Sequence, residues 1–394
     1  MAKGFQAVGM ECDVVVVGAG IIGSSAAYHL AKRGKNTVLL DQFPIPHNRG
    51  SSGGHSRIIR QANYGDPAVT PIMKAAYSKW MELQTMADTT LYRPAPLLFV
   101  ADGESPESVA TYKRGLESVR QCGYQPKEMT ITDANAMYKT KFPNSYIAMV
   151  DPTAGVLLAD KCVYTYQHLF KEHGGKILDT WPVTDIVPGS NYSSTSVEIF
   201  GPRGRIRARA LVICPGAWAG NILPLIGIHL PLRVEKILVQ YWRHLDSDIP
   251  EYVLVDCRTE DDLYYGLPDT DYPGYMKVCY HGGPVVDPNK RDQGDLSEVR
   301  KKMRSYISQY IPSLDPNCAI EEPCMYTITP DWDFVLDRHP VHHNIVFAAG
   351  FSGTGFKLAP VCGEALARLT CGEPLELDFS AFALNRFNTT NKVI

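Results

Sequence analysis

The first forty residues contain the feature that most constrains the fold. An apolar, β-branched run at 13–17 is followed at once by Gly18-Ala19-Gly20-Ile21-Ile22-Gly23, and then by apolar residues at helical spacing over 24–32. A second apolar run, 37–40, ends at Asp41, about 20 positions beyond Gly20. Strand, glycine-rich turn, helix, strand and acid in this order predict a βαβ unit that binds a dinucleotide.

Each residue of this unit has a physical role in that prediction. Gly18 permits a tight turn, Gly20 lets the backbone approach a pyrophosphate, and Gly23 allows the helix to pack closely on the strand. The helix N-terminus then directs its partial positive charge at the phosphates, and Asp41 can accept hydrogen bonds from a ribose. A purely structural turn is the alternative, and the motif does not distinguish FAD from NAD.

Length and composition exclude several other classes. With 394 residues the chain is too long for one ordinary core, so two intertwined domains are expected. A net charge of -3 provides no field for gathering polyanions, so we expect no nucleic-acid partner. The most apolar early run is too short to cross a bilayer, so we expect no membrane span. The 10 cysteines form no zinc-like pattern, so reduced thiols and no metal site are expected.

Later segments indicate how the chain is divided. Two of them, 210–218 and 344–369, again read as strand, tight turn and helix, and we expect both to add strands to the first sheet. Alternating stretches such as 263–267 and 276–280 favour a second, mostly antiparallel sheet. The predicted fold class is α/β, with a Rossmann-like dinucleotide domain interleaved with a substrate domain. The expected ranges are 1–91, 155–225 and 325–394 for the first domain, and 92–154 and 226–324 for the second.

Motifs from near the start to near the end of the chain resemble those of one enzyme family. They are Gly18–Gly23 with Asp41, Ser56-Arg57-Ile58-Ile59-Arg60, Tyr264-Tyr265-Gly266, Met276 to His281, Cys324-Met325-Tyr326-Thr327, and Ala349 to Lys357. Together they resemble monomeric sarcosine oxidases and, more closely, animal peroxisomal sarcosine/L-pipecolate oxidases. The resemblance implies an FAD-dependent amine oxidase that acts on a small secondary amino acid, with oxygen as acceptor and hydrogen peroxide as product.

The resemblance also implies roles for individual residues. Cys324 matches the cysteine that carries the flavin through a thioether, so the FAD is expected to be covalent. Arg60 and Lys357 match the cations that bind the substrate carboxylate, a role that suits a fork-shaped donor and a point charge. Lys277 matches a lysine over flavin N5, where a fixed cation stabilises charge as oxygen is reduced.

Other matching positions are expected to lie beside the flavin and the substrate. The resemblance places Arg57 and His281 next to both, and Tyr265 and Tyr326 in the lining of the site. We therefore predict Lys277, His281, Arg57 and Tyr265 as catalytic residues, and Arg60, Lys357 and Tyr326 as substrate-binding residues. The predicted cofactor contacts are Gly18, Gly20, Ile22, Gly23, Asp41, Ser56, Arg57, Cys324, Gly353, Gly355 and Lys357.

The sequence departs from the family pattern at two positions. Thr354 and Gly53 stand where family members commonly have histidine. The choice among sarcosine, L-pipecolate, L-proline and larger N-substituted amino acids therefore stays open. The resemblance implies a monomer in the peroxisome, but the last residues, Lys392-Val393-Ile394, do not match the S-K-L address, so a cytoplasmic location is the alternative.

Three other functions are compatible with parts of the sequence. The first is a flavin dehydrogenase that passes electrons to a carrier protein, and Lys277 argues against it. The second is a flavin-binding protein without turnover, which would need neither Lys277 nor the carboxylate-binding cations. The third is a nicotinamide-dependent enzyme built on the same glycine motif.

Overall fold

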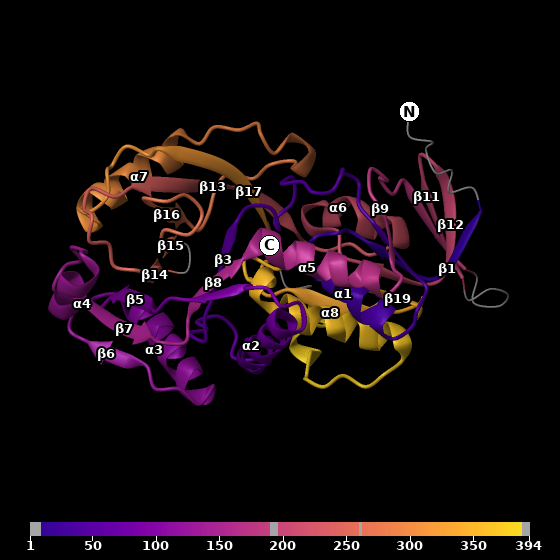
Figure 1. Cartoon of the computed structure of the whole chain (residues 1–394), viewed down its shortest axis with the longest axis horizontal. Coiled ribbons are helices and arrows are strands. Elements are labelled where there is room, and N and C mark those ends of the chain that lie inside the picture. Colours follow the sequence, from indigo (N-terminus) through magenta and orange to yellow (C-terminus); the bar gives the residue numbers. More distant parts are fainter. Residues whose placement is uncertain (1–8, 190–195, 260–261, 388–394) are drawn as a thin grey trace. The chain divides into compact units, whose positions relative to one another are not determined.

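The structure, a computed structural model, describes residues 9–189, 196–259 and 262–387. The chain divides into two compact units, each built from separate stretches of sequence (Figure 1). The first unit comprises the described residues of Met1–Gly53, Asp160–Arg233 and Tyr326–Ile394. The second unit comprises Gly54–Ala159 and Val234–Met325. The chain therefore leaves the first unit and returns to it twice.

A mixed sheet with a parallel centre forms the first unit. The parallel strands lie in the order β9–β2–β1–β12–β19, and the other strands are antiparallel additions at the edges. The parallel strands are β1 (Met10–Val17), β2 (Thr37–Leu40), β9 (Lys176–Leu178), β12 (Gly204–Ile213) and β19 (Ile345–Ala349). The antiparallel strands are β10 (Asp185–Pro188), β11 (Val197–Gly201) and β18 (Val335–Arg338). The prediction that the two later segments add strands to the first sheet is confirmed.

The central strands of this sheet are buried on both faces because helices cover it. All four residues of β2 are buried, as expected for a parallel strand between two helical layers. The helices are α1 (Ile21–Lys32), α5 (Ala159–Glu172), α6 (Ala219–Ile222) and α8 (Gly355–Cys371), with 3₁₀ turns at Gly216–Trp218, Leu223–Ile226, Ser380–Phe382 and Leu384–Phe387. A Cβ added at Gly363 of α8 would lie 2.2 Å from the Ser25 hydroxyl oxygen of α1. Helices from the two ends of the described chain therefore pack in close contact.

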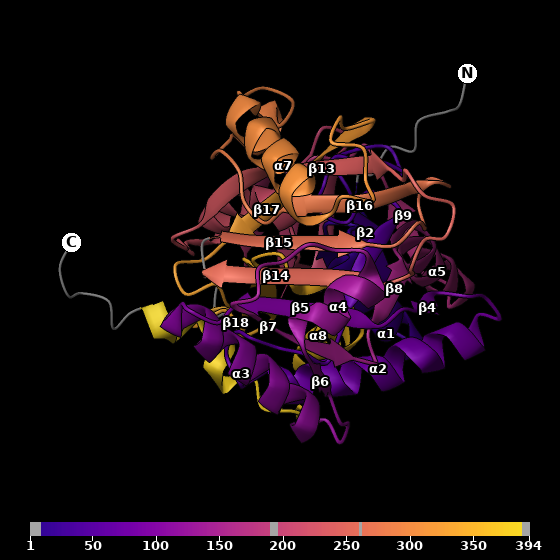
Figure 2. The same ribbon diagram turned by 90° about the vertical axis from the view of Figure 1, so that its left-hand side faces the viewer.

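The second unit is built on a larger sheet. Its order is β17–β13–β16–β15–β14–β5–β7–β6, and Figure 2 shows most of these strands side by side. The bounds are β5 (Leu97–Asp102), β6 (Lys127–Met129), β7 (Tyr146–Asp151), β13 (Arg233–Arg243), β14 (Val253–Thr259), β15 (Asp262–Leu267), β16 (Tyr275–Tyr280) and β17 (Ile320–Ile328). The pairing of β14 with β5 is parallel, and the pairs β13–β16, β14–β15, β15–β16, β5–β7 and β6–β7 are antiparallel. The predicted mostly antiparallel sheet is confirmed.

A small sheet and four helices complete the second unit. The small sheet has the order β3 (Ser56–Ile59), β8 (Gly155–Leu158) and β4 (Tyr92–Pro94). The helices are α2 (Val69–Met86), α3 (Pro106–Gln121), α4 (Ile131–Tyr138) and α7 (Ser297–Tyr310), and a 3₁₀ turn spans Pro288–Lys290.

Strand alternation decides which side chains of the large sheet reach the site. Met276 and Val278 of β16 pack in one apolar cluster with Met303 and Ile307 of α7. Because successive side chains of a strand point to opposite faces, Lys277 lies on the face away from α7.

The compact units differ from the expected domain ranges mainly at 54–91. This segment groups with the second unit because its strands β3 and β4 pair with β8. Residues 226–233 group with the first unit, where Ile226, Ile228 and Leu232 pack in its core. As a statement about domains, the expected ranges stay a prediction.

None of the described helices is long and apolar enough to cross a membrane. In the same residues, no group of three or more His, Cys, Asp or Glu side chains could hold a metal ion. The C-terminal tripeptide, 392–394, lies outside the described residues.

Candidate active site

In the first unit, the glycine-rich turn joins β1 to α1 as predicted. Gly18 has a φ of 98°, and a Cβ there would lie 2.2 Å from the carbonyl oxygen of Cys214. A Cβ at Gly23 would lie 1.9 Å from the carbonyl oxygen of Gly18. Neither position has room for a side chain, so both glycines are required by the turn itself.

The start of α1 is suited to an anion. No side chain of the N-cap residue, Gly20, closes the helix, and its first turn carries no acidic residue. The Ile21 backbone N–H donates to the Ser52 hydroxyl oxygen at 2.9 Å. The neighbouring residues Ile22 and Gly23 are buried in the same turn. These backbone donors, with the positive end of the helix dipole, fit a dinucleotide pyrophosphate.

Asp41 holds this loop in place. Its carboxylate is 8% exposed and accepts from the backbone N–H groups of Ala19 and Phe43, each at 2.9 Å. A ring nitrogen of His47 lies 3.1 Å from the same carboxylate. A carboxylate has about four lone-pair sites, so hydrogen bonds from a ribose remain chemically compatible with these contacts.

The start of α8 forms the other predicted cofactor contact in the first unit. Gly353 has a φ of 82° and Gly355 opens the helix, so the turn between β19 and α8 needs glycine. No side chain caps this helix start either. Lys357 is 6% exposed, and its Nζ donates to the Thr354 carbonyl oxygen at 3.2 Å. A buried ammonium thus lies beside uncapped helix N–H groups, an arrangement that favours a nearby anion.

In the second unit, Lys277 is buried in a hydrogen-bonded cluster. Its Nζ lies 3.1 Å from the Ser56 hydroxyl oxygen, 3.3 Å from the Ser56 carbonyl oxygen and 3.3 Å from Asp271 Oδ2. Arg57 joins the same cluster, because its Nη1 donates to the Ser56 carbonyl oxygen at 2.7 Å. Three predicted site residues, Ser56, Arg57 and Lys277, are therefore brought together by β3 and β16.

Asp271 is a site residue that sequence reasoning missed. Burial alone would raise the pKa of this carboxyl, but the Lys277 ammonium and hydrogen bonds from Ser56, Tyr241 and Lys277 outweigh it and hold the pKa below its usual range. Lys277 is therefore one half of a buried ion pair, and not an isolated cation.

Arg60 is a buried cation, and one of its nitrogens has no hydrogen-bond partner among the described residues. The residue is 6% exposed, and its guanidinium lies over the Tyr64 ring, 4.2 Å from the centroid. Nη1 is buried and has no hydrogen-bond partner among the described residues. Burial raises the pKa of Tyr64 although the Arg60 charge lowers it, so the tyrosine remains a neutral platform. A buried donor without a partner is costly, which favours an anionic ligand at this position.

Tyr265 and His281 form an aromatic pair on the same sheet. Their ring centroids are 6.0 Å apart, and the ring planes meet at 82°. Tyr265 lies opposite Cys279 in the register of β15 with β16. Residues opposite each other share a face, so Tyr265 lies on the Lys277 face of the sheet.

Cys324 and Tyr326 lie two residues apart on β17, so their side chains point to the same face. Cys324 is 8% exposed, and its thiol contacts the Met325 carbonyl oxygen at 3.8 Å. Tyr326 is half-buried. None of the 10 cysteines, all of which lie among the described residues, forms a disulfide.

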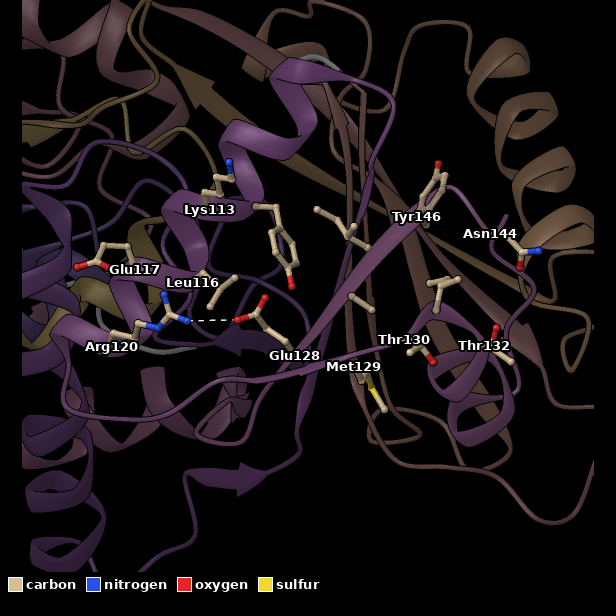
Figure 3. A pocket seen from close by; sticks show the side chains of 14 residues that line it. Lys113, Leu116, Glu117, Arg120, Glu128, Met129, Thr130, Thr132, Asn144 and Tyr146 are labelled. Atoms are coloured by element: carbon tan, nitrogen blue, oxygen red, sulfur yellow. Dashed lines mark hydrogen bonds and ion pairs between the residues drawn. The ribbon is translucent and has the colours of Figure 1, made fainter.

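An open groove lies elsewhere on the second unit (Figure 3). It has a volume of about 890 Å³ and is lined by residues of α3, β6, α4 and β7. Its charged side chains include Arg120 and Glu128, which pair at 3.2 Å. None of the predicted site residues lines this groove.

Comparison with known proteins gives a consistent assignment. Residues 13–369 match the model of the FAD dependent oxidoreductase family. The chain is 38% identical to a peroxisomal sarcosine oxidase of Mus musculus, over 96% of this chain and 97% of the relative. It is 33% identical to a monomeric sarcosine oxidase of Bacillus sp. (strain NS-129), over 95% and 96% respectively. L-proline dehydrogenase from P. horikoshii shares the fold, with a TM-score of 0.83 at 23% identity over 97% of this chain and 99% of that chain.

Proposed function

Because this chain belongs to the FAD-dependent oxidoreductase family, and within it to the sarcosine oxidases, we propose that it oxidises the C–N bond of a small secondary amino acid. Sarcosine, L-pipecolate and L-proline are the first substrates to test. When bound, FAD accepts a hydride equivalent from the carbon next to the amine nitrogen, and oxygen then takes up the electrons and is reduced to hydrogen peroxide. The imine product hydrolyses in water.

The buried guanidinium of Arg60 carries this proposal. Its Nη1 has no partner among the described residues, and an amino-acid carboxylate would supply one. We propose that Arg60 and Lys357 bind this carboxylate, with Tyr326, so that the reacting carbon is held in one orientation. Arg60 contributes a planar fork of donors and Lys357 a compact charge.

The remaining predicted residues supply positive charge or line the site. We propose that Lys277 supplies the positive charge near which oxygen is reduced, because a cation fixed in advance stabilises negative charge without reorganisation. Arg57 adds a second cation next to it, since both donate to the Ser56 carbonyl oxygen. Tyr265 and His281 form the wall on the same sheet.

We also propose that Cys324 carries the flavin as a thioether. Its thiol, which forms no disulfide, and its place two residues before Tyr326 on β17 support this role. A covalent tether would keep the cofactor bound during turnover and would raise its potential. The link would join the Cys324 sulfur to the 8α-methyl carbon of the flavin, and the two electrons and two protons that this step releases would pass through the flavin to oxygen. Cys324→Ser should therefore bind flavin without the link.

The decisive experiment combines a spectrum with an acceptor test. The purified protein should be yellow, and after acid precipitation the flavin colour should stay in the pellet, whereas in Cys324→Ser it should pass into the supernatant. With sarcosine or L-pipecolate, the protein should consume oxygen and release peroxide. Electron transfer only to an artificial acceptor would indicate a dehydrogenase, and flavin binding without turnover would indicate a binding protein. A protein that stays colourless with added FAD would refute the proposal.

The named relatives support proposals about the cellular compartment and the oligomeric state. The Mus musculus relative is named a peroxisomal enzyme and the Bacillus relative a monomeric one. We propose a peroxisomal monomer, with a cytoplasmic location as the alternative. Co-sedimentation with catalase in cell fractionation and light scattering of the purified protein test the two statements separately.

A further inference from the structure

The cluster around Lys277 contains a carboxylate that the proposed chemistry does not use. Asp271 lies in the loop between β15 and β16 and is paired with Lys277 at 3.3 Å, with side-chain exposures of 2% and 5%. Its Oδ2 also accepts from the Ser56 hydroxyl at 2.7 Å and from the Tyr241 hydroxyl at 2.9 Å. Three donors thus converge on one oxygen.

We propose that Asp271 is the positioning residue for Lys277: its carboxylate fixes the ammonium on the face of the sheet away from α7 and supplies its counter-charge. This inference rests on the proposed function, because it concerns the cation assigned to oxygen reduction. It goes beyond that function by naming the residue that controls this cation.

The need for a counter-ion follows from the burial and the neighbouring charge. A buried ammonium loses its hydration, and it keeps its proton only where a nearby anion compensates. Here the Ser56 carbonyl oxygen accepts from Arg57 Nη1 as well as from Lys277, so a second cation approaches the same atom. Repulsion between the two cations would favour neutral Lys277 if Asp271 were absent.

The other groups facing the pair do not replace Asp271. Tyr241 of β13 stands opposite Lys277 in the strand register, and burial, with the Asp271 and Glu322 charges, raises its pKa, so it is a neutral donor. Glu322 of β17 accepts from Tyr241 at 3.2 Å and from Tyr272 at 2.5 Å, one hydroxyl removed from the ammonium. Burial raises the pKa of Cys279 although the Lys277 charge lowers it, so this thiol is neutral.

The position of Asp271 also explains how the carboxylate is held. Tyr241 and Ser56 donate to Oδ2 from strands β13 and β3, while Oδ1 is buried with no partner among the described residues. The carboxylate is therefore fixed through the oxygen that touches Lys277. A change at Asp271 alters the charge of the cluster, whereas a change at Tyr241 removes a donor and leaves the charge intact.

The test measures the two half-reactions of the holoenzyme separately in stopped-flow experiments from pH 6 to pH 10. In Asp271→Asn, flavin reduction by the amino acid without oxygen should stay within about threefold of wild type. Reoxidation by oxygen should be near wild type at pH 6 and should fall by about tenfold or more as pH rises, because Lys277 then loses its proton. Asp271→Glu should restore most of the wild-type pH profile.

Tyr241→Phe is the matched control. It removes the hydroxyl that lies within hydrogen-bond distance of Asp271 and Glu322 but no charge, so its reoxidation should keep the wild-type pH profile. If Asp271→Asn kept the wild-type reoxidation rate at every pH, or slowed both half-reactions equally at every pH, Asp271 would have no positioning role.

Thermal unfolding provides a readout that does not depend on turnover. Asp271→Asn and Lys277→Met should each lower the unfolding midpoint, and the double variant should lower it by less than the sum, because the last variant leaves no unpaired buried charge. Additive shifts would refute the pairing. This cycle stays informative if wild type fails to react with oxygen, an outcome that would refute the proposed function instead. If Asp271→Asn alone does not fold, recovery of folding in the double variant supports the pairing and continued failure contradicts it.

Discussion

The first unit presents its candidate cofactor contacts mainly through the backbone, whereas the second unit presents charged side chains. At the start of α1, glycines and backbone N–H groups form the site, and substitution is limited by space. In the second unit, Arg60 and Lys277 are buried cations on separate strands or loops, and their effect depends on partners. Cofactor binding should therefore be sensitive to volume, and catalysis should be sensitive to charge.

The largest effect is expected at a glycine of the first unit. Gly23→Val would place a side chain where even a Cβ lies 1.9 Å from the Gly18 carbonyl oxygen. We expect a loss of more than about 4 kcal/mol in unfolding free energy and no bound flavin. Urea unfolding measures the free energy, and the ratio of flavin absorbance to protein absorbance measures the bound flavin. Gly220→Val, where no atom lies within 4 Å of the added Cβ, is the control and should retain flavin.

Arg60→Met should separate catalysis from folding. The substitution removes the cation but keeps an apolar side chain over Tyr64. We expect kcat/KM for the amino acid to fall by about 10²–10³-fold with the flavin content unchanged. Steady-state oxygen uptake measures this loss, and Arg120→Met, which changes an exposed pair with Glu128, is the control. An Arg60→Met enzyme with wild-type kcat/KM would remove the observation on which the proposed function depends.

Asp256 should make the second unit sensitive to pH. Burial raises its pKa to about 6, although the Arg258 charge opposes the shift. The folded state thus holds its proton where the unfolded chain has lost it, so this group's contribution to stability falls as pH rises from about 4 to about 6. Ionisation of Asp256 lowers the unfolding free energy by on the order of 3 kcal/mol above pH 6, and this loss disappears below pH 4.

The difference in unfolding free energy between wild type and Asp256→Asn should follow this pH window in urea titrations. Asp271 affects stability in the opposite direction, because its lowered pKa adds stability that is lost as pH falls. This contribution is the same in wild type and in Asp256→Asn, so it does not change the difference. Asp246→Asn, at a side chain that is 52% exposed, should show a difference of less than about 1 kcal/mol at every pH. A flat difference for Asp256→Asn would show that its charge is fully compensated.

The smallest effect concerns a side chain that supports the backbone site. Ser52→Ala removes the acceptor of the Ile21 N–H, so we expect a loss of about 1 kcal/mol in stability. Because the same turn faces the cofactor, non-covalent flavin affinity in a Cys324→Ser background should fall by about fivefold. Ser105→Ala removes the N-cap of α3 in the second unit and should cost similar stability without changing flavin affinity.

The sequence predicted the candidate site of the first unit better than that of the second. The first depends on a motif of consecutive residues, whereas the second depends on contacts between residues that are far apart in sequence. The turn from Gly18 to Gly23 and the acid Asp41 lie within 24 consecutive residues, and their spacing follows from the βαβ geometry itself. In the second unit, no local pattern brings Ser56 to Lys277, and only the family resemblance nominated them. Their contact is made by β3 and β16, which are far apart in sequence.

The residues that sequence reasoning missed lie in loops or act through their partners. Asp271 is one of two acidic residues in the loop before β16, and nothing in its spacing distinguishes it from a solvent-exposed turn residue. Ser52 lies in a Gly/Ser-rich loop and bonds a helix start 31 positions earlier.

The close packing of α8 on α1 has a consequence for biosynthesis. The nucleotide-binding sheet starts with β1 but needs β19, and its first helix is covered by α8 near the other end of the described chain. During translation, the glycine-rich turn leaves the ribosome hundreds of residues before these partners, while the second unit can already collapse. Loading of the cofactor must therefore wait until synthesis is nearly complete, and nascent chains stalled before residue 345 should not retain flavin.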